Sequence, residues 1–170
     1  KASDLKYGLK KGTYNVIEII PDEIITRHLK VAYDGTAFEL DDVLKISVIE
    51  RYGKGVPPAL GLVRGLGLIR GAIASSVAHD SHNIITIGAS EADMAFAANS
   101  LLTSGGGFCV VEDGVLLARL ELPIAGLLSL QSAESISEKV GLLKIAFKRL
   151  GVKLHEPFLQ MAFLALPVIP

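Results

Sequence analysis

The sequence predicts an α+β or α/β domain, with a mixed β-sheet, two main amphipathic helices packed on it and a short β meander in front. Three observations predict this fold class. Short β-rich runs separated by turn formers fill the first quarter of the chain, two later segments carry helix caps, and 50% of the 170 residues are hydrophobic. A chain of this length and composition can bury one hydrophobic core between a sheet and its helices.

The β-rich lead-in covers residues 1–42, and the main domain is expected to cover residues 43–170 as one compact unit. Within the lead-in, the turn formers Pro21-Asp22 and Asp34-Gly35 separate runs rich in Val, Ile, Thr and Tyr. Such spacing is typical of two or three strands in a meander.

A strand is expected next, because Leu44, Ile46 and Val48 alternate with Lys45 and Ser47. The Gly- and Pro-rich residues 54–71 carry few polar groups, so we expect them to wind against other structure. Residues 71–78 fit either a strand or a buried helix, whereas residues 82–90 read as a strand.

The first helix is expected over residues 91–104. Ser90 can cap its N-terminus, and Asp93 three residues later completes a capping-box arrangement. Three glycines, Gly105–Gly107, then end the helix, because glycine readily supplies a left-handed C-terminal turn. A β-hairpin is expected to follow, with Asp113-Gly114 as its two-residue turn.

The second helix is expected over residues 133–150, with Ser135 and Glu138 as a further capping box and Gly151 at its end. Apolar residues recur there at spacings of four and three, which draws one stripe against the core. That stripe consists of Ile136, Val140, Leu143, Phe147 and Leu150.

Composition excludes several classes of function. The net charge is −1 and no run of Lys or Arg is present, which argues against nucleic-acid binding as the main role. The longest membrane-like stretch contains Arg64 and Arg70, so we expect neither a transmembrane span nor membrane binding. The single cysteine, Cys109, lies in an apolar strand and fits an inert buried thiol in a reducing, cytoplasmic setting.

The termini suggest a piece of a larger protein. The N-terminus, "KASDLKYGLKKGTYN", has neither an initiator Met nor the apolar core of a signal peptide. At the other end, "FLQMAFLALPVIP" is so apolar that we expect it to lie inside a core.

Most of the candidate chemistry lies in "HDSHN", which is His79, Asp80, Ser81, His82 and Asn83. His79, Asp80 and His82 could be metal ligands, although a spacing of three in an irregular turn does not by itself aim two imidazoles at one point. A second interpretation is a hydrogen-bonded turn in which Asp80 and Asn83 bond nearby backbone amides and one histidine donates to a carbonyl. A third is a set of substrate contacts facing a pocket.

No complete catalytic motif accompanies this segment. The sequence has no Gly-x-Ser-x-Gly elbow, and its "GGGFC" run lacks the Lys-Ser/Thr of a phosphate-binding loop. Glu50 and Arg51 at a strand end are interpreted as a solvated or paired rim, with an acid–base role as the alternative, and both are kept as candidate site residues.

Several multi-residue blocks, in the same order, resemble the C-terminal domain of bacterial and archaeal adenine deaminases. They are "GLIRGAIASSVAHDSHNIITIGASEADMAFAANSLLTSGGGFCVVEDG", "LPIAGLLS" and "PFLQMAFLALPVIP", and "YNVIEIIPDEIITRHL" resembles the segment leading into that domain. The resemblance covers nearly the whole chain.

The resemblance implies a function for the longer protein. Adenine deaminases belong to the amidohydrolase superfamily and hydrolyse adenine to hypoxanthine and ammonia, using manganese or iron in a (β/α)8 barrel. In that family a metal-bound water attacks the purine, consistent with the ability of metals to supply hydroxide near neutral pH. The barrel and its His-x-His ligand pair would precede these residues, which contain no His-x-His.

The implied role is therefore that of a companion domain. It would pack on its own N-terminal barrel, shape the adenine pocket and contribute to a homo-oligomer, and it would be inactive alone. The resemblance also favours a site role for His79, Asp80 and His82. Family members often carry a histidine where this chain has Tyr52, which puts any metal or substrate role at that position in doubt. The alternative is a stand-alone binding, regulatory or structural module derived from that domain.

Overall fold

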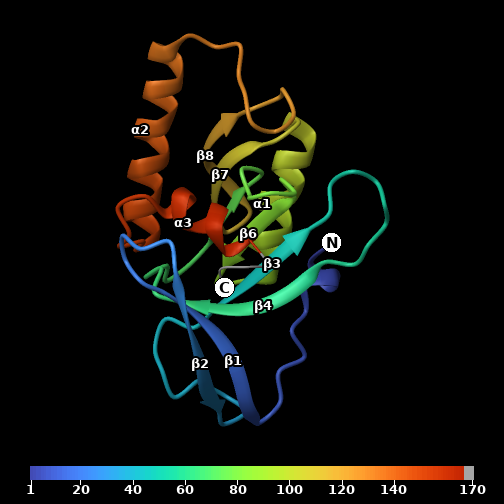
Figure 1. Ribbon diagram of the computed structural model, residues 1–170, viewed down its shortest axis with the longest axis vertical. Helices are drawn as coiled ribbons and strands as arrows, with labels where there is room; N and C mark the ends of the chain where they lie inside the picture. The colour runs from blue at the N-terminus through green and yellow to red at the C-terminus, as the bar shows by residue number, and fades with distance from the viewer. Residues whose placement is uncertain (167–170) are drawn as a thin grey trace.

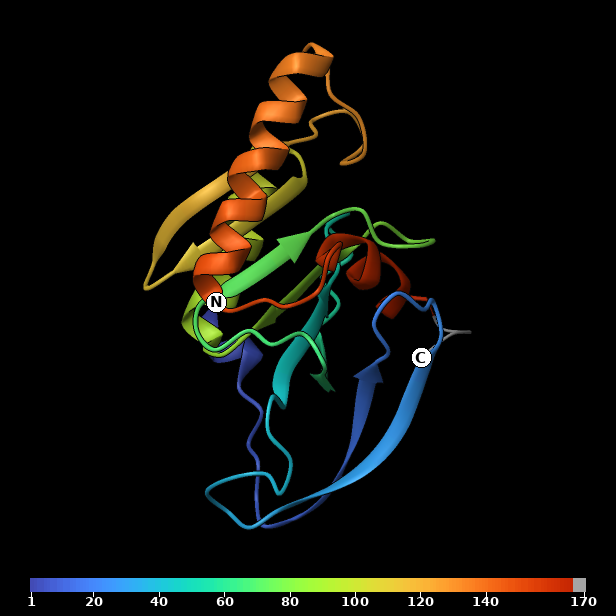
Figure 2. The same cartoon turned by 90° about the vertical axis from the view of Figure 1, so that its left-hand side faces the viewer.

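A computed structural model describes residues 1–166 of the chain, and its fold is α+β, as predicted from the sequence. One eight-stranded sheet has the order β2-β1-β4-β3-β6-β5-β7-β8. Among the strands of residues 1–166, only β1 and β4 pair in parallel, at two residue pairs, so the sheet is mixed. Helices cover both faces of the sheet (Figures 1 and 2).

The strands have the following bounds: β1 Gly12–Ile19, β2 Thr26–Tyr33, β3 Leu44–Ile49, β4 Ala59–Arg64, β5 Ala72–Ser75, β6 Ile84–Gly88, β7 Gly107–Glu112 and β8 Val115–Glu121. The helices are the 3₁₀ turn η1 Ala2–Leu5, α1 Glu91–Ser104, α2 Ala133–Leu150 and α3 Pro157–Leu164.

Alternation along the central strands explains the two-layer core. Ile73 of β5 faces the cluster beneath α2 and α3, whereas its neighbours Ala72 and Ala74 face α1. The same alternation places Val110 on the α2 side and Cys109 on the α1 side. A strand covered on both faces has no solvent side, which explains why the run at residues 71–78 lacks a clear period.

The lead-in strands β1 and β2 form an antiparallel hairpin, which confirms the meander. They project below the rest of the sheet (Figure 2), and Val16 and Val31 form a separate small core with Leu62. Whether a domain boundary lies at residue 42 stays a prediction.

The predicted helix ends and hairpin turn are largely confirmed. Ser90 caps α1 by accepting from the Asp93 backbone, and Gly105 ends that helix with φ of 79°. Asp113 and Gly114 both take positive φ in the turn between β7 and β8. One cap was wrong: the N-cap of α2 is Ser132, whose hydroxyl accepts from the N–H of Ser135.

One further expectation needs correction. Residues 52–57 lie exposed in a loop, and only the later part of the 54–71 segment packs against the core. On β3 the predicted alternation is confirmed, because Leu44 and Ile46 belong to one core cluster, whereas Ser47 points to the other face, where it is also buried and its hydroxyl donates to the carbonyl of Ala59 at 2.9 Å.

The apolar C-terminal run also contains a third helix, α3, which the sequence pattern did not resolve. Met161 and Leu164 of α3 are buried, as expected for this run. Residues 167–170, the last part of the same run, lie outside the described residues.

Candidate functional site

The candidate residues gather at one edge of the sheet because of the strand register. β5 and β6 are antiparallel and pair Ser75 with Ile85, so the "HDSHN" segment forms the connection at this edge. β3 ends at the same edge, where Ile49 pairs with Ile84. β8 ends there beside the start of β7, where Gly107 pairs with Glu121. Four connections that are distant in sequence therefore meet.

Arg51 connects three of these segments. Its Nε donates to the backbone carbonyl of His82 at 2.7 Å, its Nη1 donates to the carbonyl of Gly105 at 3.4 Å, and its Nη2 donates to the carbonyl of Ala125. Each acceptor lies on a different connection. Because the guanidinium fork has a fixed geometry, Arg51 sets the positions of all three backbones relative to one another. We call Arg51 and these carbonyls the Arg51 clamp.

Ser76 supports the clamp from the buried side. Its hydroxyl donates to the carbonyl of Gly126 at 2.7 Å and accepts from the N–H of Gly107 at 2.7 Å. A Cβ on Gly126 would lie 2.7 Å from Nη2 of Arg51. Gly126 also has φ of 75°, so glycine at this position both adopts the left-handed conformation readily and leaves room for the guanidinium.

The two neighbours of Arg51 have separate roles. The Tyr52 hydroxyl donates to the carbonyl of Ser81 at 2.8 Å, and the Arg51 guanidinium lies 4.9 Å from the centre of the Tyr52 ring. The carboxylate of Glu50 accepts the backbone N–H groups of Tyr52 and Lys54. The expectation of a solvated or paired Glu50–Arg51 rim needs correction for Arg51, because its guanidinium binds backbone carbonyls.

The first half of the "HDSHN" segment faces outward. The His79 side chain is 50% exposed and that of Asp80 is 88% exposed, with 3.8 Å between His79 Nδ1 and Asp80 Oδ1. The imidazole of His79 stacks on Phe163 of α3 at 5.5 Å, and its backbone N–H donates to the carbonyl of Ala162. The C-terminal helix therefore helps to position this histidine.

The second half faces inward. His82 Nδ1 and Asn83 Oδ1 are both buried and have no hydrogen-bond partner among residues 1–166. The turn interpretation was thus wrong for Asn83, whose side-chain oxygen bonds no amide. The turn is closed by the backbone, since the N–H of His82 donates to the carbonyl of Ala78 at 2.7 Å. Buried polar atoms usually have a partner, so this loop has unused hydrogen-bonding capacity.

The residues present do not fit a manganese or iron centre by themselves. Within the described part of the chain, no group of three or more His, Cys, Asp or Glu side chains could hold a metal ion. His79 is directed toward Phe163, whereas Nδ1 of His82 is buried in the loop. A metal role for His79, Asp80 and His82 would therefore need ligands from elsewhere, and it stays a prediction.

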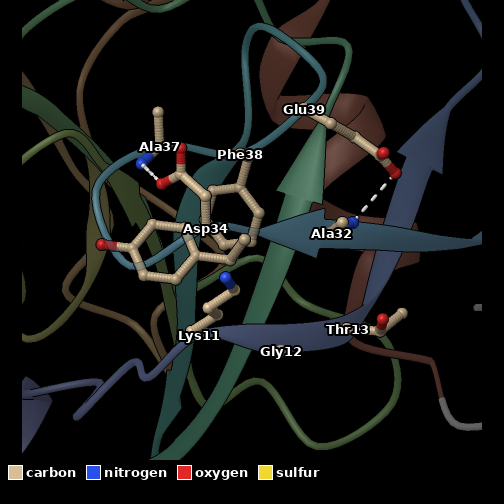
Figure 3. A pocket seen from close by; sticks show the side chains of 9 residues that line it. Lys11, Gly12, Thr13, Ala32, Asp34, Ala37, Phe38 and Glu39 are labelled. Carbon is tan, nitrogen blue, oxygen red and sulfur yellow. Dashed lines mark hydrogen bonds between the residues drawn. The ribbon is translucent and has the colours of Figure 1, made fainter.

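A separate pocket of about 370 Å³ lies on the β1–β2 hairpin, and its lining includes Tyr33 and Phe38 (Figure 3). Its carboxylates already have backbone partners. Asp34 accepts the N–H groups of Thr36 and Ala37, and Glu39 accepts that of Ala32 at 2.9 Å. These bonds shape the turn, and they leave the Arg51 clamp as the stronger candidate.

Sequence reasoning identified the "HDSHN" segment and Arg51 but missed Ser76, Gly126 and Phe163 as the residues that hold them. The signal was partly present, because "LPIAGLLS" and the C-terminal run both belong to the blocks of the resemblance. The sequence did not predict that these residues lie next to the candidate site, because their proximity depends on the order of the strands in the sheet.

The described chain is thus an α+β domain in which the candidate site residues meet at one end of the central strands, beside Arg51. Residues 23–170 match the family described as the adenine deaminase C-terminal domain. This chain belongs to that family.

Curated relatives agree with the assignment. The chain is similar to the adenine deaminase of Bdellovibrio bacteriovorus, with 64% identity over 98% of this chain and 28% of the relative. Identity is 53% to the adenine deaminase of Shewanella halifaxensis and 49% to that of Edwardsiella ictaluri, each over 99% of this chain and 29% of the relative. The chain thus spans less than a third of the length of these relatives. No helix within residues 1–166 is long and apolar enough to cross a membrane.

Proposed function

We propose that this chain is the companion domain of a cytoplasmic, homo-oligomeric adenine deaminase that hydrolyses adenine to hypoxanthine and ammonia. In this proposal the Arg51-clamped loop edge meets a manganese- or iron-bearing barrel formed by the remainder of the longer protein, and helps to shape the adenine pocket. The single observation that carries the proposal is the clamp, because it fixes a polar loop whose buried atoms lack partners within the described residues.

Each side chain has a proposed task. His79, Asp80 and Ser81 form the exposed rim of the interface with the barrel, whereas His82 and Asn83 offer hydrogen bonds to groups of the barrel or to bound adenine. Arg51, Tyr52 and Glu50 do not react; they hold the loop. Since a preformed loop avoids the entropy cost of ordering on contact, such an arrangement suits an interface whose geometry matters for catalysis.

This chain alone is expected to be inactive, because its described residues offer no ligand group for the metal centre. The test uses a chimera in which these residues replace the matching segment of the Bdellovibrio bacteriovorus adenine deaminase. The isolated chain with manganese and adenine should release no ammonia, and the chimera should deaminate adenine.

The chimera with His82→Ala and the chimera with Asn83→Ala should then lose at least about tenfold in kcat/KM, the equivalent of about 1.4 kcal/mol. A matched control is His28→Ala on the β1–β2 hairpin, which should retain the parent rate. Turnover by the isolated chain would refute the companion role. Unchanged kcat/KM and metal content in both loop variants would leave only a scaffold role for the loop.

A further inference from the structure

The solvent side of α2 carries a pattern that packing within this chain does not use. Figure 2 shows α2 lying across the near side of the molecule, with its outer side uncovered along its length. Exposed residues on this side include Glu134, Glu138, Gly141, Leu142, Ile145 and Lys148, and they are flanked by the exposed Ser137, Lys144 and Arg149. We call the first six residues the outer face of α2.

The centre of the outer face is apolar. Leu142 is 52% exposed and Ile145 is 67% exposed, although the inner stripe of the same helix already fills the core. Residues 138, 141, 145 and 148 recur at spacings of three, four and three, which places them along one line of the helix. A Cβ on Gly141 would meet no other atom within 4 Å, so the helix surface is open beside Ile145.

The two charged residues on this line have opposite signs and lie toward opposite ends of the helix. Glu138 lies toward the N-terminus and Lys148 toward the C-terminus, and neither side chain has an ion-pair partner among the described residues. They are ten residues apart, or roughly 15 Å along the axis at 1.5 Å per residue, so they cannot pair within one helix. An antiparallel copy of the same helix reverses the order and places opposite charges against each other.

We propose that the outer face of α2 is the centre of a twofold interface with a second copy of this chain. In it, Ile145 of each copy packs on Gly141 of the other, Leu142 lies near the axis, and Glu138 faces the partner's Lys148. The pattern is self-complementary, as a twofold interface requires. It names the surface for the homo-oligomer in the proposed function, but its test does not depend on deaminase activity.

The first experiment is a charge reversal measured by sedimentation equilibrium of the chain. Glu138→Lys or Lys148→Glu alone places like charges against each other, and each should raise the dimer dissociation constant at least about tenfold. The double variant E138K/K148E restores opposite pairs and should return the constant to within about threefold of the parent. A matched reversal on the β1–β2 side, Lys11→Glu, should have no effect.

The second experiment is a disulfide test that needs no equilibrium constant. Leu142→Cys should form a covalent dimer on mild oxidation, whereas Val115→Cys, which is similarly exposed at the β7–β8 hairpin, should remain monomeric. The native Cys109 does not compete, because it is buried and burial raises the pKa of its thiol to about 12. A parent chain that stays monomeric at every concentration overturns the proposal, and so does a double reversal that fails to rescue.

Discussion

Arginines lie near both ends of strand β7, but they bind different kinds of partner. At its start, the N–H of Gly107 donates to the hydroxyl of Ser76, which in turn donates to the carbonyl of Gly126, the residue after Ala125 of the Arg51 clamp. At its end, the carboxylate of Glu112, only 8% exposed, is paired with Arg70 from the segment before β5 and with Arg149 of α2 at 2.6 Å. The arginine near the start of β7 donates to backbone carbonyls, whereas the two arginines at its end pair with a single carboxylate.

The two ends therefore differ in role: the contacts near the start of β7 position the loops of the candidate site, whereas those at its end attach the strand to a helix. An arginine that donates to three carbonyls specifies the backbone path of three loops. The Glu112 cluster joins a strand to a helix through side chains, so small backbone shifts can be absorbed by rotation of the two exposed arginines. The loop end is thus the end built for defined geometry, and four predictions test this contrast.

The largest effect is expected from Gly107→Ala. Gly107 has φ of 132°, and an added Cβ would overlap the carbonyl oxygen of Leu120 on β8. Backbone overlap combined with an unfavourable φ should lower the free energy of unfolding by about 3 kcal/mol or more. Urea unfolding measures this loss. Gly114→Ala in the exposed hairpin turn, where a Cβ meets nothing within 4 Å, is the control and should cost less than half as much.

The next largest effect is expected from Arg51→Ala, which leaves the carbonyls of His82, Gly105 and Ala125 without this donor. Hydrogen bonds to charged groups contribute about 1.5–3 kcal/mol each, but partial exposure reduces the total, so a loss of roughly 2–4 kcal/mol is expected. Arg51→Lys should recover less than half, because an ammonium cannot reproduce the fork. Full recovery by lysine would show that charge alone matters and would contradict the clamp.

A smaller effect is expected from Glu112→Gln at the other end of β7. The amide keeps the shape but removes the charge facing Arg70 and Arg149, whose side chains are largely exposed. Because the arginines can return to water, we expect a loss of about 1–2 kcal/mol. Hydrogen exchange should remain unchanged in residues 79–83. A loss larger than that of Arg51→Ala would reverse the ranking of the two ends.

The smallest effect is expected from Tyr52→Phe, which removes only the hydroxyl that donates to Ser81. The cost should be about 0.5–1.5 kcal/mol, since the ring still stacks under Arg51. Amide exchange near Ser81 should quicken while that of β7 stays as it was. If exchange near Ser81 does not change, Tyr52 has no role in holding the loop.

Local signals predicted much of the fold. Ser90, Gly105–Gly107 and the Asp113-Gly114 turn each act within a few residues, so the sequence contains what decides them. The same locality explains one failure. Ser132 stands three residues before Ser135, and Ser135 stands three residues before Glu138, so either serine has the spacing of an N-cap. Which one caps the helix depends on where the helix begins.

The site was predictable only in part. The "HDSHN" segment stands out by composition, but the role of Arg51 depends on three acceptors that lie 31, 54 and 74 residues away. These residues are brought together only by the order of the strands in the sheet, and no local sequence pattern specifies that order. The buried His82 Nδ1 and Asn83 Oδ1 follow from the same closure.

Hydrogen–deuterium exchange tests the central claim most directly, by comparing this chain alone with the Bdellovibrio chimera. If the clamped edge meets the remainder of the enzyme, residues 79–83 should exchange at least about tenfold more slowly in the chimera, and the β1–β2 pocket should not change. Equal exchange of residues 79–83 in the two proteins would show that the edge faces solvent, and the companion-domain account would be wrong.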